Sequence, residues 1–189
     1  MLDNKTTKEE ARPDKDCSAC RSQLCYKGRD CYPEVNQEIL ERYREGDSLK
    51  LARASACIEA AHYMKATRLE EIKYFAREMG YTRLGIAACI GLVSEAQAIA
   101  EYLKRDFEVF LIICKHGGIP KKQLSLPQIS QDEGREEIMC NPIGQAEYLN
   151  QHQTELNIIC GLCIGHDILF TQNSSAPVTT IIVKDRVLG

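Results

Sequence analysis

The chain has 189 residues, of which 44% are hydrophobic and 27% charged, with a formal net charge of -3. This length suits one core with a small appendage, and the lack of a basic excess argues against nucleic acid as the main partner. The longest apolar runs are far shorter than the roughly 20 residues that a membrane helix needs.

Residues 1–16 are polar and contain no apolar centre, so we expect no secretory signal and a cytoplasmic protein. The cytoplasm keeps thiols reduced. The ten cysteines are therefore expected to be ligands, nucleophiles or buried residues rather than disulfides.

Four cysteines lie close together near the start of the chain, with the spacing C-x2-C-x4-C-x5-C: Cys17, Cys20, Cys25 and Cys31. Apolar residues are too sparse here to build a core, and a metal held by four thiolates would hold such a segment together. Zinc usually takes two C-x2-C-like pairs, whereas iron–sulfur clusters tolerate uneven spacing. The sequence predicts a metal-binding segment over residues 1–33, with a [4Fe-4S] cluster favoured and zinc as the alternative.

Helices are predicted next. Residues 34–66 form a helical segment with helices over Glu34–Arg44 and Leu49–Met64, and Cys57 in the second helix is expected to be buried. Thr67 followed by Glu70 is a capping box that opens a third helix, which ends before Gly80. This helix begins the last predicted domain, residues 67–189.

From residue 81 the pattern changes to strands separated by helices. Arg83–Cys89, a helix over Ser94–Arg105 and Glu108–Cys114 form a βαβ unit, whose crossover makes the strands parallel. A third strand ends at Cys160, and Val178–Lys184 is the fourth. The predicted fold class is α/β, with a small, mainly parallel four-stranded sheet and crossover helices, preceded by the helical segment and the four-cysteine metal loop.

Thiols follow several of these strands. The carboxyl ends of parallel strands share one edge of a sheet, where such folds place their sites. Thiolates brought together there would repel one another, and a bound metal would relieve the repulsion. We therefore expect a second metal or redox site among residues that share this edge: Cys89, Cys114, Cys140, Cys160, Cys163 and His166.

Two other interpretations of this edge remain open. One of the same cysteines could be a catalytic nucleophile, with His116 or His166 as its base. Alternatively, most of the thiols could simply be buried packing residues.

Several stretches of the chain resemble a known family: RLEEIKYFAREMGYTRLGIAACIGL, CNPIGQAEYLN, NIICGLCIGHDILF and APVTTIIVKDRVLG. The family comprises uncharacterised cysteine-rich proteins of anaerobic bacteria and archaea described as predicted metal-binding, the domain-of-unknown-function family 1847. The resemblance covers most of the chain and implies metal binding and anaerobic life, but no assigned reaction. A few further residues usually follow the terminal strand in that family, so Gly189 would be a short end.

The spacing of Cys17, Cys20 and Cys25 is also similar to cluster-binding segments of carbon monoxide dehydrogenases, which favours iron–sulfur. The leading functional prediction is thus a cytoplasmic metal-binding protein with an iron–sulfur cluster or zinc, a second thiol-rich redox or metal-handling site, and a redox partner protein. The alternatives are a thiol-dependent enzyme and a zinc-stabilised partner-binding module. No nucleic-acid or membrane partner is expected, and the oligomeric state stays open.

Overall fold

The computed structural model describes residues 17–130, 134 and 136–187. The polar leader considered above, residues 1–16, lies outside these ranges. The chain forms two compact units that meet between Arg53 and Ala54.

The first unit contains two short 3-10 helices and one long helix. These are η1 (Cys17–Ala19), η2 (Leu24–Lys27) and α1 (Pro33–Arg44), followed by the start of α2 (Ser48–His62). Pro33 stands at the first position of α1, where its missing N–H costs no hydrogen bond. No residue of η1, η2 or α1 is buried in the described part of this unit, so these elements have no hydrophobic core of their own.

The helices predicted before the sheet are confirmed within about two residues at each end. Thr67 caps α3 (Arg68–Met79): its Oγ1 accepts a hydrogen bond from the Glu70 N–H at 3.4 Å, and the Glu70 carboxylate accepts one from the Thr67 N–H at 2.8 Å. Gly80 ends α3 with a φ of 75°. The expectation that Cys57 is buried was wrong, because α2 packs through Ala54 and leaves Cys57 exposed.

Four parallel strands form one sheet, as predicted, in the order β2-β1-β3-β4. They are β1 (Arg83–Ala88), β2 (Glu108–Ile113), β3 (Leu156–Cys160) and β4 (Val178–Ile182). The chain adds β2 on one side of β1 and then β3 on the other, so the strand order reverses between β1 and β3. In open parallel sheets, ligands bind outside the carboxyl ends of the strands at such a reversal.

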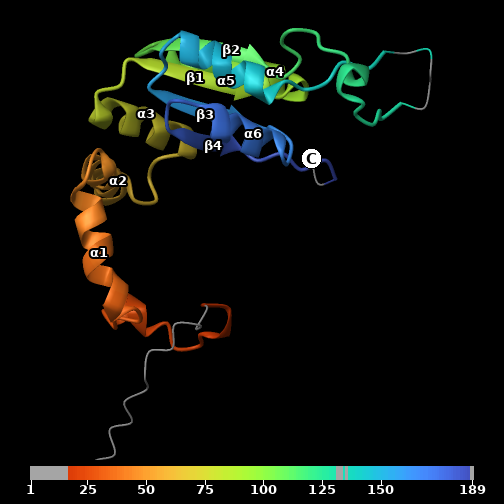
Figure 1. Cartoon of the computed structure of the whole chain (residues 1–189). Helices are drawn as coiled ribbons and strands as arrows, with labels where there is room; N and C mark the ends of the chain where they lie inside the picture. Colours follow the sequence, from red (N-terminus) through yellow and green to blue (C-terminus); the bar gives the residue numbers. More distant parts are fainter. Residues whose placement is uncertain (1–16, 131–133, 135, 188–189) are drawn as a thin grey trace, which may run out of the picture. The chain divides into compact units, whose positions relative to one another are not determined.

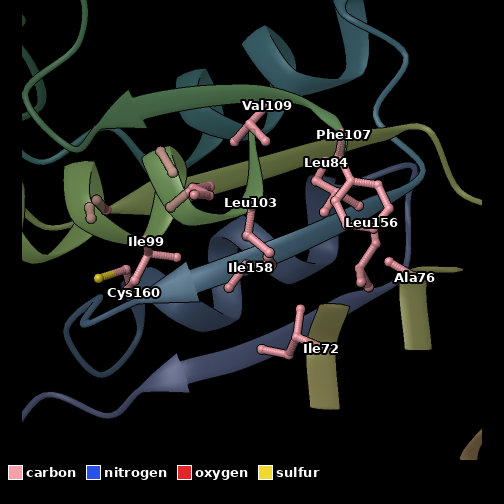
Figure 2. Packing of buried hydrophobic residues seen from close by; sticks show 14 residues of the cluster. Ile72, Ala76, Leu84, Ile99, Leu103, Phe107, Val109, Leu156, Ile158 and Cys160 are labelled. Carbon is pink, nitrogen blue, oxygen red and sulfur yellow. The ribbon is translucent and has the colours of Figure 1, made fainter. Parts of the chain in front are cut away.

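Helices cover both faces of this sheet. α3 and α4 (Val93–Leu103) pack on one face, and their core includes Ile72, Leu84 and Ile158 (Figure 2). On the other face, α5 (Pro142–Gln151) and α6 (His166–Asn173) lie side by side (Figure 1). Their core includes Ala87, which follows Ile86 of the first core in β1, because successive strand residues face opposite sides.

The sequence did not predict α6. This helix has eight residues, and its apolar residues Ile168, Leu169 and Phe170 are consecutive rather than spaced at the helical period. Within the described ranges, no helix is long and apolar enough to cross a membrane.

The close packing of α5 on β1 generates a first prediction. A Cβ atom added at Gly85 would lie 2.1 Å from Asn157 Oδ1 and 2.7 Å from Leu149 Cδ1. Asn157 cannot give way easily, because it accepts a hydrogen bond from Thr154 and donates one to Ser174, both at 2.8 Å. Gly85→Ala should lower the free energy of unfolding by about 1–3 kcal/mol, measured by chemical denaturation.

Gly91→Ala is the matched control, because a Cβ there would meet only Lys184 Nζ at an ordinary 3.5 Å. Equal stability of the two variants would contradict the close approach of α5 to β1.

Candidate functional site

Three cysteines meet where β1, β2 and α5 come together. Cys89 directly follows β1, Cys114 directly follows β2, and Cys140 lies two residues before α5. Backbone hydrogen bonds extend past the strand ends: the Cys114 N–H donates to the Ala88 carbonyl at 2.9 Å, and the Asn141 N–H donates to the Cys114 carbonyl at 2.7 Å. Cys89 and Cys114 are only 6% and 2% exposed, whereas Cys140 is half-buried, so solvent reaches the group through Cys140.

Cys114 is the central member of this group. Its thiol hydrogen-bonds to Cys140 on one side and to Cys89 on the other. Its sulfur also accepts a hydrogen bond from the Ile90 N–H at 3.3 Å. We call these three neighbouring cysteines the thiol triplet (Cys89, Cys114 and Cys140).

A lysine that follows the last strand places its positive charge beside Cys89, at one end of the triplet. Lys184, two residues beyond β4, places Nζ 2.8 Å from Cys89 Sγ. Burial by itself would raise the pKa of Cys89, but the hydrogen bonds donated by Lys184 and by the Gly91 N–H outweigh it, and the pKa is lowered. The same contact raises the pKa of Lys184, which favours an ammonium–thiolate pair.

Cys140 is a thiolate at neutral pH. The hydrogen bond from Cys114 lowers the pKa of Cys140 to about 5, and the positive charge of Lys115 acts in the same direction. The pKa of Cys114 is raised well above its ordinary value, first by this hydrogen bond and then by burial. The protonated Cys114 thus lies beside the Cys140 thiolate, and Cys89, on its other side, loses its proton more readily than an ordinary thiol.

Gln145 holds the strand ends that carry these cysteines. This residue of α5 is fully buried, and its Nε2 donates to the carbonyl oxygens of Ala88 at 3.2 Å and Ile112 at 2.9 Å. Its Oε1 has no hydrogen-bond partner within the described residues. By bridging β1 and β2 just before Cys89 and Cys114, Gln145 fixes the distance between the two thiols.

The structure does not bring every predicted edge residue into the triplet. Cys160 is fully buried in the core under α3 and α4, on the opposite face of the sheet, and burial raises its pKa to about 11. Cys163 accepts a hydrogen bond from Arg186 at 2.9 Å. The ring of His116 packs against Tyr148, with centroids 5.9 Å apart, whereas His166 lies close enough to Cys140 to act on its charge.

Sequence reasoning missed the two lysines. Lys184 lies two residues beyond β4, at the carboxyl edge that the strand pattern had identified, and Lys115 directly follows Cys114. A basic residue immediately after a predicted strand was therefore a usable signal. Without side-chain geometry, however, nothing in the sequence joins Lys184 to a cysteine 95 positions earlier.

The four predicted N-terminal ligands lie in the first unit, and all of them are exposed: Cys17, Cys20, Cys25 and Cys31. The pKa of Cys20 is lowered, first by a hydrogen bond from the Gln23 N–H and then by Ser22. Across residues 17–130, 134 and 136–187, no group of three or more His, Cys, Asp or Glu side chains is arranged to hold a metal ion. Metal binding by these thiols stays a prediction.

Fold and site define a class: an α/β protein with a parallel sheet and a thiol triplet at its carboxyl edge. The chain belongs to the family described as "Protein of unknown function (DUF1847)", whose model matches residues 28–181. It is 54% identical over 173 residues to "Uncharacterized protein MJ0455" of Methanocaldococcus jannaschii, an alignment that covers 92% of this chain and 89% of the relative. No solved structure matches the chain. The family membership expected from the sequence is confirmed.

The charge pattern of the triplet predicts a distinctive pH dependence of alkylation. Because only the thiolate reacts, an ordinary cysteine gains about tenfold in rate per pH unit up to a pKa of about 8.5. Cys140, whose pKa is about 5, should already react at its plateau rate above about pH 6. Cys114→Ala removes the hydrogen-bond donor, leaves Lys115 and His166 in place, and should move the inflection for Cys140 upwards.

The measurement is the rate of iodoacetamide labelling at Cys140, followed by peptide mass spectrometry from pH 4 to 10. Cys163→Ala is the control, since Cys163 does not contact Cys140 through any hydrogen bond of the described residues. An inflection for Cys140 that is the same in the natural protein and in Cys114→Ala would contradict the assigned hydrogen bond.

Proposed function

We propose that the protein is a metal-binding thiol-redox protein. In this proposal the thiol triplet cycles between reduced thiols and a disulfide, and the four N-terminal cysteines hold a [4Fe-4S] cluster or zinc. Reduced thiols fit the cytoplasm, and electrons would be exchanged with a redox partner protein.

The observation that carries the redox part is that backbone hydrogen bonds bring Cys89, Cys114 and Cys140 together at one edge of the sheet, where the three thiols act on one another's pKa values. Disulfide chemistry needs a thiolate that attacks and a second thiol within reach. The triplet contains both, and it exposes the Cys140 thiolate more than the others. Reaction with an outside disulfide would therefore start at Cys140.

Lysines favour thiol chemistry over a metal at this edge. A metal ion bound by Cys89 would have to displace the Lys184 ammonium, whose Nζ lies 2.8 Å from the sulfur. The protein's own cations already compensate the thiolates, so the repulsion that suggested a bound metal is relieved without one. Metal binding by Cys89, Cys114, Cys140, Cys160, Cys163 and His166 is thus the less favoured proposal.

The metal part is supported by the chemistry of the N-terminal segment. Four thiols fall within fifteen residues that have no hydrophobic core, and a backbone N–H already donates to the Cys20 sulfur. Hydrogen bonds of this kind stabilise thiolates bound to a cluster and tune its potential. Since the four sulfurs are not arranged round a common centre, this segment would fold round its metal as it binds.

The redox proposal predicts that the reduced triplet gives up two electrons for each disulfide that it forms. Incubation of the reduced, oxygen-free protein with graded ratios of oxidised to reduced dithiothreitol should oxidise triplet cysteines, quantified by differential alkylation and mass spectrometry. Cys140→Ala should slow this oxidation by at least about tenfold, because the exposed attacking thiolate is gone.

Cys163→Ala, which removes an equally accessible thiol outside the triplet, should oxidise at the natural rate. If the triplet stays fully reduced under all ratios that oxidise small dithiols, the redox part of the proposal is wrong.

The metal proposal predicts metal in protein purified without oxygen. Analysis should find about four iron and four sulfide per chain with broad violet absorption, or about one zinc in a colourless protein. Cys20→Ser should lose most of the metal, whereas Cys57→Ser, an exposed cysteine outside the N-terminal group, should retain it. Natural protein that is metal-free with all four N-terminal thiols reduced would refute this part.

A further inference from the structure

Cys114 lies between two cysteines that differ in their exposure to solvent. One neighbour, Cys140, is half-buried, whereas the other, Cys89, is 6% exposed and lies in the core under α5 and α6. Cys114 itself is 2% exposed. An outside reagent therefore meets Cys140 first, and oxidation can reach Cys89 only through Cys114.

We propose that Cys114 is an exchange thiol, which forms a disulfide first with Cys140 and then with Cys89 when the site reduces a low-molecular-weight disulfide. This rests on the proposed redox function of the triplet and names its substrate class and its oxidised end state. In that end state the disulfide joins Cys89 to Cys114, and Cys140 is again a free thiolate.

In the first step, the Cys140 thiolate attacks one sulfur of the substrate R–S–S–R′. The substrate S–S bond breaks, R′S⁻ leaves, and Cys140 carries R as a mixed disulfide. The positive charge of Lys115, which lies near Cys140, favours the thiolate that attacks. No other component is needed, because the substrate itself is the oxidant.

In the second step, Cys114 attacks the Cys140 sulfur of the mixed disulfide. RS⁻ leaves and takes the proton of the Cys114 thiol, so that RSH departs and a Cys114–Cys140 disulfide remains. Two thiol groups of the protein have then been oxidised and one substrate disulfide has been reduced to two thiols. The Asn141 N–H donates to the Cys114 carbonyl at 2.7 Å, which holds Cys140 beside Cys114, and the two thiols interact strongly enough to shift each other's pKa.

In the third step, the Cys89 thiolate attacks the Cys114 sulfur and expels Cys140 as a thiolate. One S–S bond breaks and one forms, so no electrons enter or leave. Lys115 stabilises the departing Cys140 thiolate, and thiols whose thiolates are stabilised in this way leave faster.

The third step also moves the negative charge towards solvent. Before it, the charge lies on Cys89, which is 6% exposed and paired with Lys184. After it, the buried pair is a neutral disulfide, the charge lies on the half-buried Cys140, and water can solvate Lys184, which is itself only partly buried. Solvation of both separated charges then favours the inner disulfide.

Peptide mapping tests this directly, because digestion with trypsin and with Glu-C, which cuts after Glu, separates the three cysteines from one another and from Cys160 and Cys163. Cys89 then falls in residues 84–95, Cys114 in residues 109–115 and Cys140 in residues 138–147. The full-length reduced protein is treated without oxygen with bis(2-hydroxyethyl) disulfide, acid-quenched at successive times, alkylated and digested. The neutral probe avoids any preference that comes from substrate charge.

The expected result is an early link between the Cys114 and Cys140 peptides that gives way to a link between the Cys114 and Cys89 peptides, in at least about tenfold final excess. Cys89→Ser should stop at the first link. Cys114→Ala should accumulate the probe on Cys140, and Cys163→Ala should behave like the natural protein.

Two failures have different meanings. A Cys114–Cys140 disulfide that persists in the natural protein would overturn the exchange and leave the redox function standing. If no link forms among the three peptides although the exposed thiols react with the probe, both the exchange and the redox function are wrong.

Discussion

The pairing of a buried thiolate with a lysine is the interaction on which this site depends. Cys89 is 6% exposed, and a charge there would be costly without Lys184 Nζ at 2.8 Å. That cation stands beyond the last strand of the sheet. The pairing of β3 with β4 at the edge of the sheet therefore positions the lysine that stabilises negative charge on Cys89, at the end of β1.

The topology explains why the thiols meet here. Parallel pairing puts the ends of all four strands at one edge, and the order reverses between β1 and β3. Gln145 then bridges β1 and β2 from α5, which brings Cys89 and Cys114 to one level and presents Cys140 beside them. A parallel α/β sheet thus produces a site in which three neighbouring thiols have different pKa values.

The sequence predicted much of the fold because the strands and the capped α3 carry strong local signals. It also predicted Cys89, Cys114 and Cys140 at one edge, because Cys89 and Cys114 follow strands and Cys140 precedes a helix that begins at the same edge. It could not separate Cys160 from them, because the face on which a strand-end residue lies changes with a shift of one position. The sequence could not predict the contact between Lys184 and Cys89, because this contact depends on tertiary geometry. It did not predict α6, because the apolar residues of this helix lack helical periodicity.

The central claim is that the triplet holds a protonated Cys114 between two cysteines of lowered pKa. The most direct test is an NMR titration of the cysteine ¹³Cβ shifts in reduced, selectively labelled full-length protein, assigned with single Cys→Ala variants. The account predicts a thiolate shift at pH 7 for Cys140, a titration of Cys89 below its ordinary pKa and a thiol shift for Cys114 that persists to high pH. Three thiols that titrate together near the ordinary value of about 8.5 would contradict it.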